Sequence, residues 1–146
     1  GTENIYGIVG LAKAMEIANR NMAADHAKIQ DLKNYLILQL QKHIPDISFN
    51  GSIHPDQSLY TVLSVSIPPN SLNEMLLFML DLEGVCVSGG SACNSGAAKG
   101  SHVLEALKVP DDRVAIRFSF NKYNTREEID YAVGKLHKVL QSSLAV

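Results

Sequence analysis

The first 44 residues carry a helical pattern that is too long for a small domain to cover. Apolar side chains recur there at intervals of three and four residues, as they do on one face of a helix. These side chains are Ile5, Ile8, Val9, Ala12, Met15, Met22, Ile29, Leu32, Leu36 and Leu40. Asp25 and His26 interrupt the stripe, which therefore predicts one kinked helix or two helices, and Pro45 ends it. Because such a helix exceeds the usual globular length, we expect residues 1–44 to connect the domain to something beyond it.

Short strands and helices alternate after this first segment. Runs of alternating apolar and small residues predict strands at 47–49, 59–67, 85–87 and 114–120. Helical spacing predicts helices at 72–80, at 101–107 and from 125 onward. Two of these helices begin with a capping box, Ser71 with Glu74 and Thr125 with Glu128. This order of elements predicts one α+β domain, a small and mostly antiparallel sheet with helices packed on one face.

Composition excludes several classes of function. The 146 residues are 46% apolar and 19% charged with a formal net charge of −2, which gives no electrostatic reason to bind nucleic acid or an anionic membrane. No apolar run approaches the ~20 residues of a membrane span, and no signal peptide is visible. The chain lacks an initiator Met, so we expect a piece of a longer, cytoplasmic chain. Two cysteines and five scattered histidines lack the spacing of metal ligands, so no metal site is predicted.

The two cysteines have different surroundings. Cys86 lies between two valines, which predicts packing in the core. Cys93 lies within residues 88–100, where four glycines and three serines predict a mobile loop. A thiol on such a loop can carry a group from one place to another, and Lys99 or His102 could favour its thiolate form. From position alone, a reactive thiol and an incidental exposed thiol both remain open.

Two further residues are candidates for binding an anion. Arg117 alternates with Ile116 and Phe118, so we expect its guanidinium on the sheet face that the helices leave uncovered. There it could hold a carboxylate through two parallel hydrogen bonds, although an exposed strand arginine or an ion pair is the simpler alternative. Thr2 and Asn4 stand near a helix start, where free N–H groups attract anions or where a side chain caps the helix.

The segment Ser88-Gly89-Gly90-Ser91-Ala92-Cys93-Asn94-Ser95 resembles the active-site cysteine loop of the cysteine desulfurases, the NifS/IscS group. The resemblance extends over nearly the whole chain. Residues 1–4, 102–107, 116–119 and 125–131 resemble segments of that family in the same order and with similar spacing.

This resemblance implies the C-terminal domain of a homodimeric, fold-type I enzyme that depends on pyridoxal phosphate. The cofactor would be bound to a lysine of a large domain that this chain does not contain, so the 146 residues alone are expected to be inactive. Cys93 would take the sulfur of L-cysteine as a persulfide, leave L-alanine and pass the sulfur to an iron–sulfur scaffold or another acceptor protein. Arg117 would hold the substrate carboxylate, and Thr2 would reach the cofactor phosphate of the partner subunit.

Two other functions remain open at this point. The domain could be a stand-alone sulfur carrier or partner-docking module that uses Cys93 to accept a persulfide made elsewhere. It could also belong to a sibling pyridoxal enzyme such as a selenocysteine lyase. A plain aminotransferase is disfavoured, because its chemistry has no use for a thiol in this loop.

Overall fold

The sheet is antiparallel and small. In the computed structural model, residues 1–72, 75–89 and 101–142 are described, and within them four strands pair in the order β1-β2-β4-β3. The strands are β1 (Ser48–Phe49), β2 (Val62–Ile67), β3 (Ser88–Gly89) and β4 (Val114–Ser119). The long central pair is β2 and β4, in a register that runs from Val62 opposite Ser119 to Ile67 opposite Val114. The predicted strands at 47–49, 59–67 and 114–120 are confirmed, with shorter bounds.

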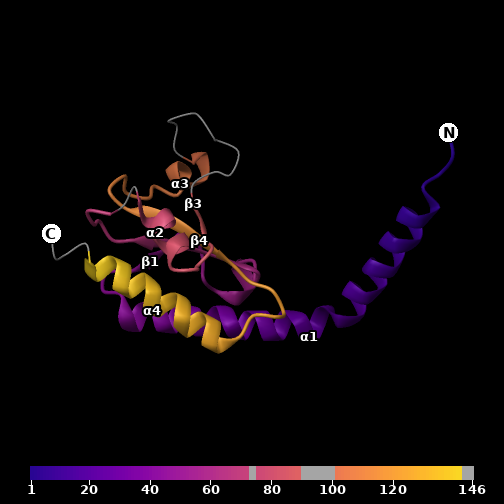
Figure 1. Ribbon diagram of the computed structural model, residues 1–146, viewed down its shortest axis with the longest axis horizontal. Helices are drawn as coiled ribbons and strands as arrows, with labels where there is room; N and C mark the ends of the chain where they lie inside the picture. The colour runs from indigo at the N-terminus through magenta and orange to yellow at the C-terminus, as the bar shows by residue number, and fades with distance from the viewer. Residues whose placement is uncertain (73–74, 90–100, 143–146) are drawn as a thin grey trace.

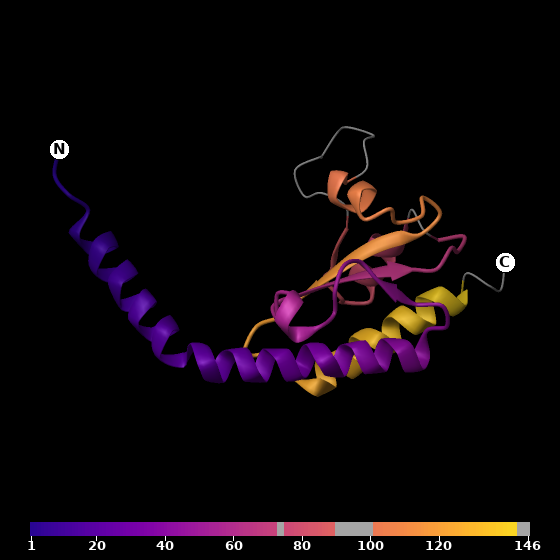
Figure 2. The ribbon, with the colours of Figure 1, turned by 180° about the vertical axis from the view of Figure 1, so that it is seen from behind.

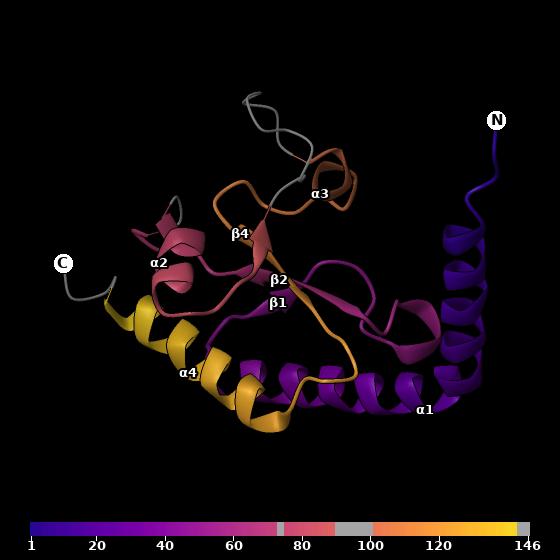
Figure 3. The same ribbon diagram turned by 45° about the vertical axis from the view of Figure 1, so that its right-hand side comes forward.

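Helices cover one face of this sheet. The α-helices of the described residues are α1 (Ile5–His43), α2 (Leu76–Leu82), α3 (His102–Ala106) and α4 (Arg126–Ser142), and one turn of 3-10 helix spans Pro55–Gln57. The second half of α1 and α4 lie side by side beneath the sheet, and α2 packs against α4 (Figure 1). The short α3 lies on the other side of the sheet (Figure 3). The predicted α+β fold is therefore confirmed, with α3 as the helix that lies off the covered face.

The alternation of apolar and small residues in β2 and β4 creates the two faces of the sheet. Leu63, Val65, Ile67, Ile116 and Phe118 point toward the helices and are at most 9% exposed. They pack with buried leucines of all three covering helices: Leu36, Leu40, Leu76, Leu80 and Leu136. Burying each such side chain contributes roughly 1.5–3 kcal/mol. The other sheet surface carries Ser64, Ser66, Ala115, Arg117 and Ser119 and is called the open face below.

Helix α1 has two dissimilar halves. From Ile29 to Leu40 one face of the helix is buried and carries Ile29, Leu32, Leu36, Ile37 and Leu40, whereas almost every residue before Ile29 is exposed. The first half bends away from the sheet and carries the N-terminus far from it (Figure 2). Of the two alternatives that the sequence predicts, one kinked helix or two helices, the structure has the first (Figure 2). No helix within the described ranges is both long enough and apolar enough to cross a membrane.

One local prediction lies partly outside the described residues, and another is wrong. Glu74, the second member of the predicted capping box, is not among the described residues; the described helix α2 begins at Leu76, and before it the Asn70 side chain accepts the N–H of Leu72 at 2.9 Å. Residues 85–87 are not a strand, because Val85 N–H bonds to Leu80 O at 2.8 Å after a turn at Gly84 (φ 75°). Pairing with β4 therefore starts only at Ser88–Gly89, two residues that had been assigned to the loop.

Candidate functional site

Arg117 lies at the middle of the open face. It is directly opposite Ser64 on β2 and directly opposite Ser88 on β3, so each neighbouring strand places a serine beside it. Its side chain is exposed, and within the described part of the chain no group forms a hydrogen bond or ion pair with the guanidinium. A rigid strand thus presents an uncompensated planar cation with five N–H donors. Arg117 lies on the open face, as predicted. The alternative prediction, an ion pair, has no acidic partner for Arg117 among the described residues.

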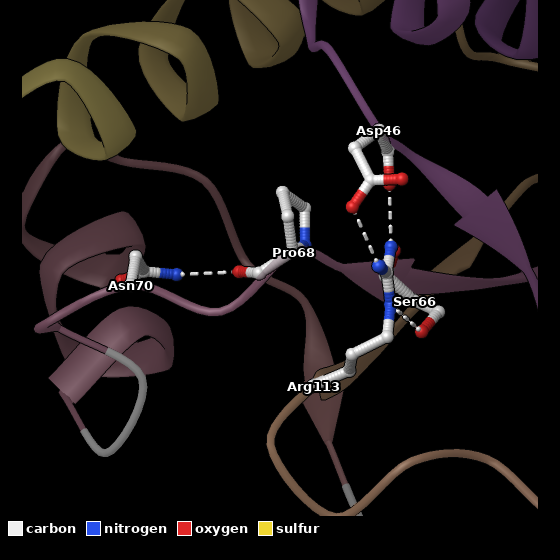
Figure 4. Close-up of polar contacts among 5 residues, drawn as sticks. All are labelled: Asp46, Ser66, Pro68, Asn70 and Arg113. Carbon is white, nitrogen blue, oxygen red and sulfur yellow. Dashed lines mark hydrogen bonds and ion pairs between the residues drawn. The ribbon is translucent and has the colours of Figure 1, made fainter.

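The other arginine of the open face, Arg113, is fully engaged (Figure 4). Its Nε donates to Ser66 Oγ at 2.9 Å, and its Nη2 donates to the carbonyl oxygens of Ser66 at 2.9 Å and of Asp46 at 2.6 Å. Its Nη1 pairs with the Asp46 carboxylate at 3.0 Å. The side chain is only 12% exposed. Arg113 therefore fastens the segment before β1 to β2 and β4, which leaves Arg117 as the open-face arginine available to a ligand.

Ser64 is oriented by a residue from the neighbouring turn. The Asn50 side-chain nitrogen donates to Ser64 Oγ at 3.1 Å, and the Asn50 backbone N–H donates to Ser64 O at 3.0 Å. No local sequence pattern indicates this contact, because the two residues meet only when β1 and β2 pair.

The candidate thiol Cys93 lies outside the described residues, but the chain that leads to it is placed. Ser88 and Gly89 form β3 at the edge of the sheet. A Cβ on Gly89 would come within 2.9 Å of Leu77 Cδ1 and 3.3 Å of the Ala115 carbonyl oxygen, so only glycine fits here without a shift. The glycine lets β3 pass close to Leu77 of α2 and pair with β4, where Ser88 lies opposite Arg117.

The second cysteine does not lie in the core. Cys86 is exposed, and its thiol is 3.9 Å from Asp81 Oδ1. The prediction of core packing is wrong because Val85 and Val87 face the core, so Cys86 between them points the other way along an extended chain. Within the described ranges, no group of three His, Cys, Asp or Glu side chains could hold a metal ion.

Asn4 and Thr2, which precede α1, differ in their contacts. Asn4 caps the helix, since its Oδ1 accepts the N–H of Gly7 at 3.0 Å. Thr2 is exposed, and no described residue bonds to its hydroxyl. The chain does not bring Thr2 and Arg117 together, because the N-terminus lies far from β4, the strand that carries Arg117 (Figure 1).

Comparison with known proteins gives one consistent result. Residues 1–132 match the aminotransferase class-V family. The cysteine desulfurase IscS of Dictyoglomus turgidum is 36% identical over 151 residues, which cover 97% of this chain and 36% of that protein. The cysteine desulfurase of Rattus norvegicus is 35% identical, with 90% of this chain and 29% of that protein covered. A solved NifS-like protein superimposes with a TM-score of 0.76 at 33% identity, covering 97% of this chain and 35% of that one. The chain thus spans about a third of the length of the relatives it matches.

Proposed function

The chain belongs to the aminotransferase class-V family, and we propose that it supplies the substrate-binding face and the sulfur-accepting thiol of a cysteine desulfurase that depends on pyridoxal phosphate. The observation that carries this proposal is the placement of Arg117. The guanidinium is exposed and without a partner among the described residues, and it stands directly beside the strand that leads to Cys93.

Arg117 binds the α-carboxylate of L-cysteine in this proposal. The planar fork of an arginine matches the two oxygens of a carboxylate and forms two parallel charge-assisted hydrogen bonds. A strand in the middle of a sheet fixes the backbone from which the fork extends, and the bound fork orients the rest of the substrate. The bound substrate then lies beside β3, the strand that precedes Cys93 in the chain.

Cys93 accepts the sulfur. It follows Gly89 by four residues, and an extended chain spans at most about 3.6 Å per residue, so its Cα lies within about 14 Å of Gly89. The Cys93 thiolate attacks the sulfur of L-cysteine, and an S–S bond forms while the C–S bond breaks. The electron pair stays with the carbon skeleton, which takes up a proton and leaves as L-alanine. The persulfide then passes to an iron–sulfur scaffold or another acceptor protein, in a cytoplasm reducing enough to keep the thiol free.

The cofactor supplies the electron sink that weakens the C–S bond of the bound substrate. Of this chain's residues, Thr2 fits its phosphate, because the hydroxyl is exposed while Asn4 already satisfies the start of α1. The separation of the N-terminus from β4 in one chain (Figure 1) supports a homodimer in which Thr2 serves the phosphate at the partner subunit's site.

Steady-state kinetics of the complete enzyme test this proposal. Arg117→Ala removes two charge-assisted hydrogen bonds, so we expect the KM for L-cysteine to rise by about tenfold or more. Arg117→Lys keeps the charge but not the fork and is expected to recover only part of the loss. Cys93→Ala is expected to abolish sulfur transfer. An Arg117→Ala enzyme with an unchanged KM would exclude the carboxylate role.

A further inference from the structure

Ser64 is the closest side chain to Arg117 on the neighbouring strand. Phe120 N–H bonds to Thr61 O at 2.8 Å, which makes these two residues a hydrogen-bonded pair of the ladder. Because such pairs alternate along antiparallel strands, Arg117 and Ser64 form a non-hydrogen-bonded pair. Side chains of that kind of pair approach most closely, with Cα atoms about 4.5 Å apart. Both side chains stand on the open face, and Ser64 is half-buried there.

The Ser64 hydroxyl already accepts one hydrogen bond, and the donor lies on the side away from Arg117. Asn50 Nδ2 donates to Ser64 Oγ at 3.1 Å from the β1 side of the sheet. A hydroxyl can accept two hydrogen bonds and donate one, so the Ser64 O–H remains free to donate. No described acceptor receives it. Because Asn50 approaches the hydroxyl from the β1 side, the Ser64 O–H can donate on the side of β4, where Arg117 stands directly opposite.

We infer that Ser64, oriented by Asn50, is a second binding residue for the substrate's α-carboxylate; this inference rests on the proposed function. The guanidinium fork uses one lone pair on each carboxylate oxygen and leaves others unused. The Ser64 hydroxyl donates to one of those remaining positions. A third donor fixes the rotation of the carboxylate about its bond to Cα, which a fork alone constrains less. Ser66, the next open-face residue of β2, cannot do this because it is only 2% exposed and lies against the Arg113 side chain, so a substrate cannot reach its hydroxyl.

The experiment is steady-state kinetics of the complete enzyme with two substrates, L-cysteine and L-cysteine amide, which lacks the carboxylate. Ser64→Ala is expected to raise the KM for L-cysteine by about tenfold, the loss typical of one hydrogen bond to a charged group. Ser64→Thr keeps the hydroxyl and is expected to stay within about threefold of the wild type. Ser48→Ala, a control on the exposed end of β1, is expected to leave the KM unchanged.

The amide substrate separates binding from folding. If Ser64 contacts the carboxylate, Ser64→Ala affects the amide far less than the acid, whereas a general loss of structure would affect both equally and would overturn the inference. An unchanged KM for L-cysteine in Ser64→Ala also overturns it. When Arg117→Ala weakens L-cysteine binding and Ser64→Ala does not, only the role of Ser64 fails. When neither substitution has an effect, the proposed substrate site itself fails.

Discussion

Arg113, just before β4, and Arg117, within β4, are expected to respond differently to the same substitution. Arg113 and Arg117 both point to the open face, but only Arg113 has partners among the described residues. In Arg113→Met, the hydroxyl of Ser66, a residue only 2% exposed, loses its donor, which costs about 1–3 kcal/mol. The lost pair with Asp46 adds less, because that carboxylate is 78% exposed and regains water. We therefore expect Arg113→Met to lower the free energy of unfolding by about 2–4 kcal/mol and Arg117→Met to change it by no more than about 0.5 kcal/mol.

Urea unfolding followed by circular dichroism measures both free energies. The transition midpoints are compared at constant slope, since a changed slope would indicate a change in the unfolded or native state rather than in the contact. Equal destabilisation by the two substitutions would refute the reasoning, because Arg117 would then have a structural partner. In kinetics the order reverses: Arg117→Met is expected to raise the KM, and Arg113→Met to leave the KM of the folded fraction near that of the wild type.

Three further outcomes follow from other parts of the fold. Thr125→Ala removes half of a reciprocal capping box at the start of α4, and thermal unfolding should show a loss of about 0.5–2 kcal/mol. Hydrogen bonds from Lys135 and Lys138 lower the pKa of Glu83 to about 2. The stabilisation that they give is therefore present above the ordinary carboxyl pKa and is lost as the pH falls toward 2. In urea unfolding at a series of pH values, Glu83→Gln should reduce the loss of stability between these two pH values. In a Cys93→Ala variant, Cys86 should react with a thiol reagent without denaturant, and a protected thiol would restore the prediction that it lies in the core.

Periodicity was sufficient to predict the layers of the fold. The alternation in β2 and β4 follows from burial of one sheet face, so the strands and the open-face position of Arg117 could be read from spacing alone. The capping box at Thr125 was also predictable, since both partners lie within one helical turn. The long α1 followed from its apolar stripe. In each case the responsible interaction is local or repeats with a fixed period.

What sequence reasoning missed depends on pairs that are distant along the chain. Arg113 meets Ser66 and Asp46 across 47 and 67 positions, and no pattern around Arg113 indicates either partner. The flanking valines predict that Cys86 lies in the core, but the hydrogen bond from Val85 N–H to Leu80 O decides which side of the chain faces inward. The pairing of Asn50 with Ser64 likewise exists only once β1 meets β2. These contacts distinguish the structural arginine from the one available to substrate.

Mass spectrometry of the complete enzyme after brief exposure to L-cysteine offers the most direct measurement. Cys93 is expected to carry one additional sulfur atom, and Cys86 is expected to remain unmodified, as fragmentation of the peptides will show. The same treatment of an Arg117→Ala enzyme at a low concentration of L-cysteine should give much less of the modified peptide. Additional sulfur on Cys86 instead of Cys93, or equal modification with and without the Arg117 guanidinium, would contradict a substrate site at the open face beside β3.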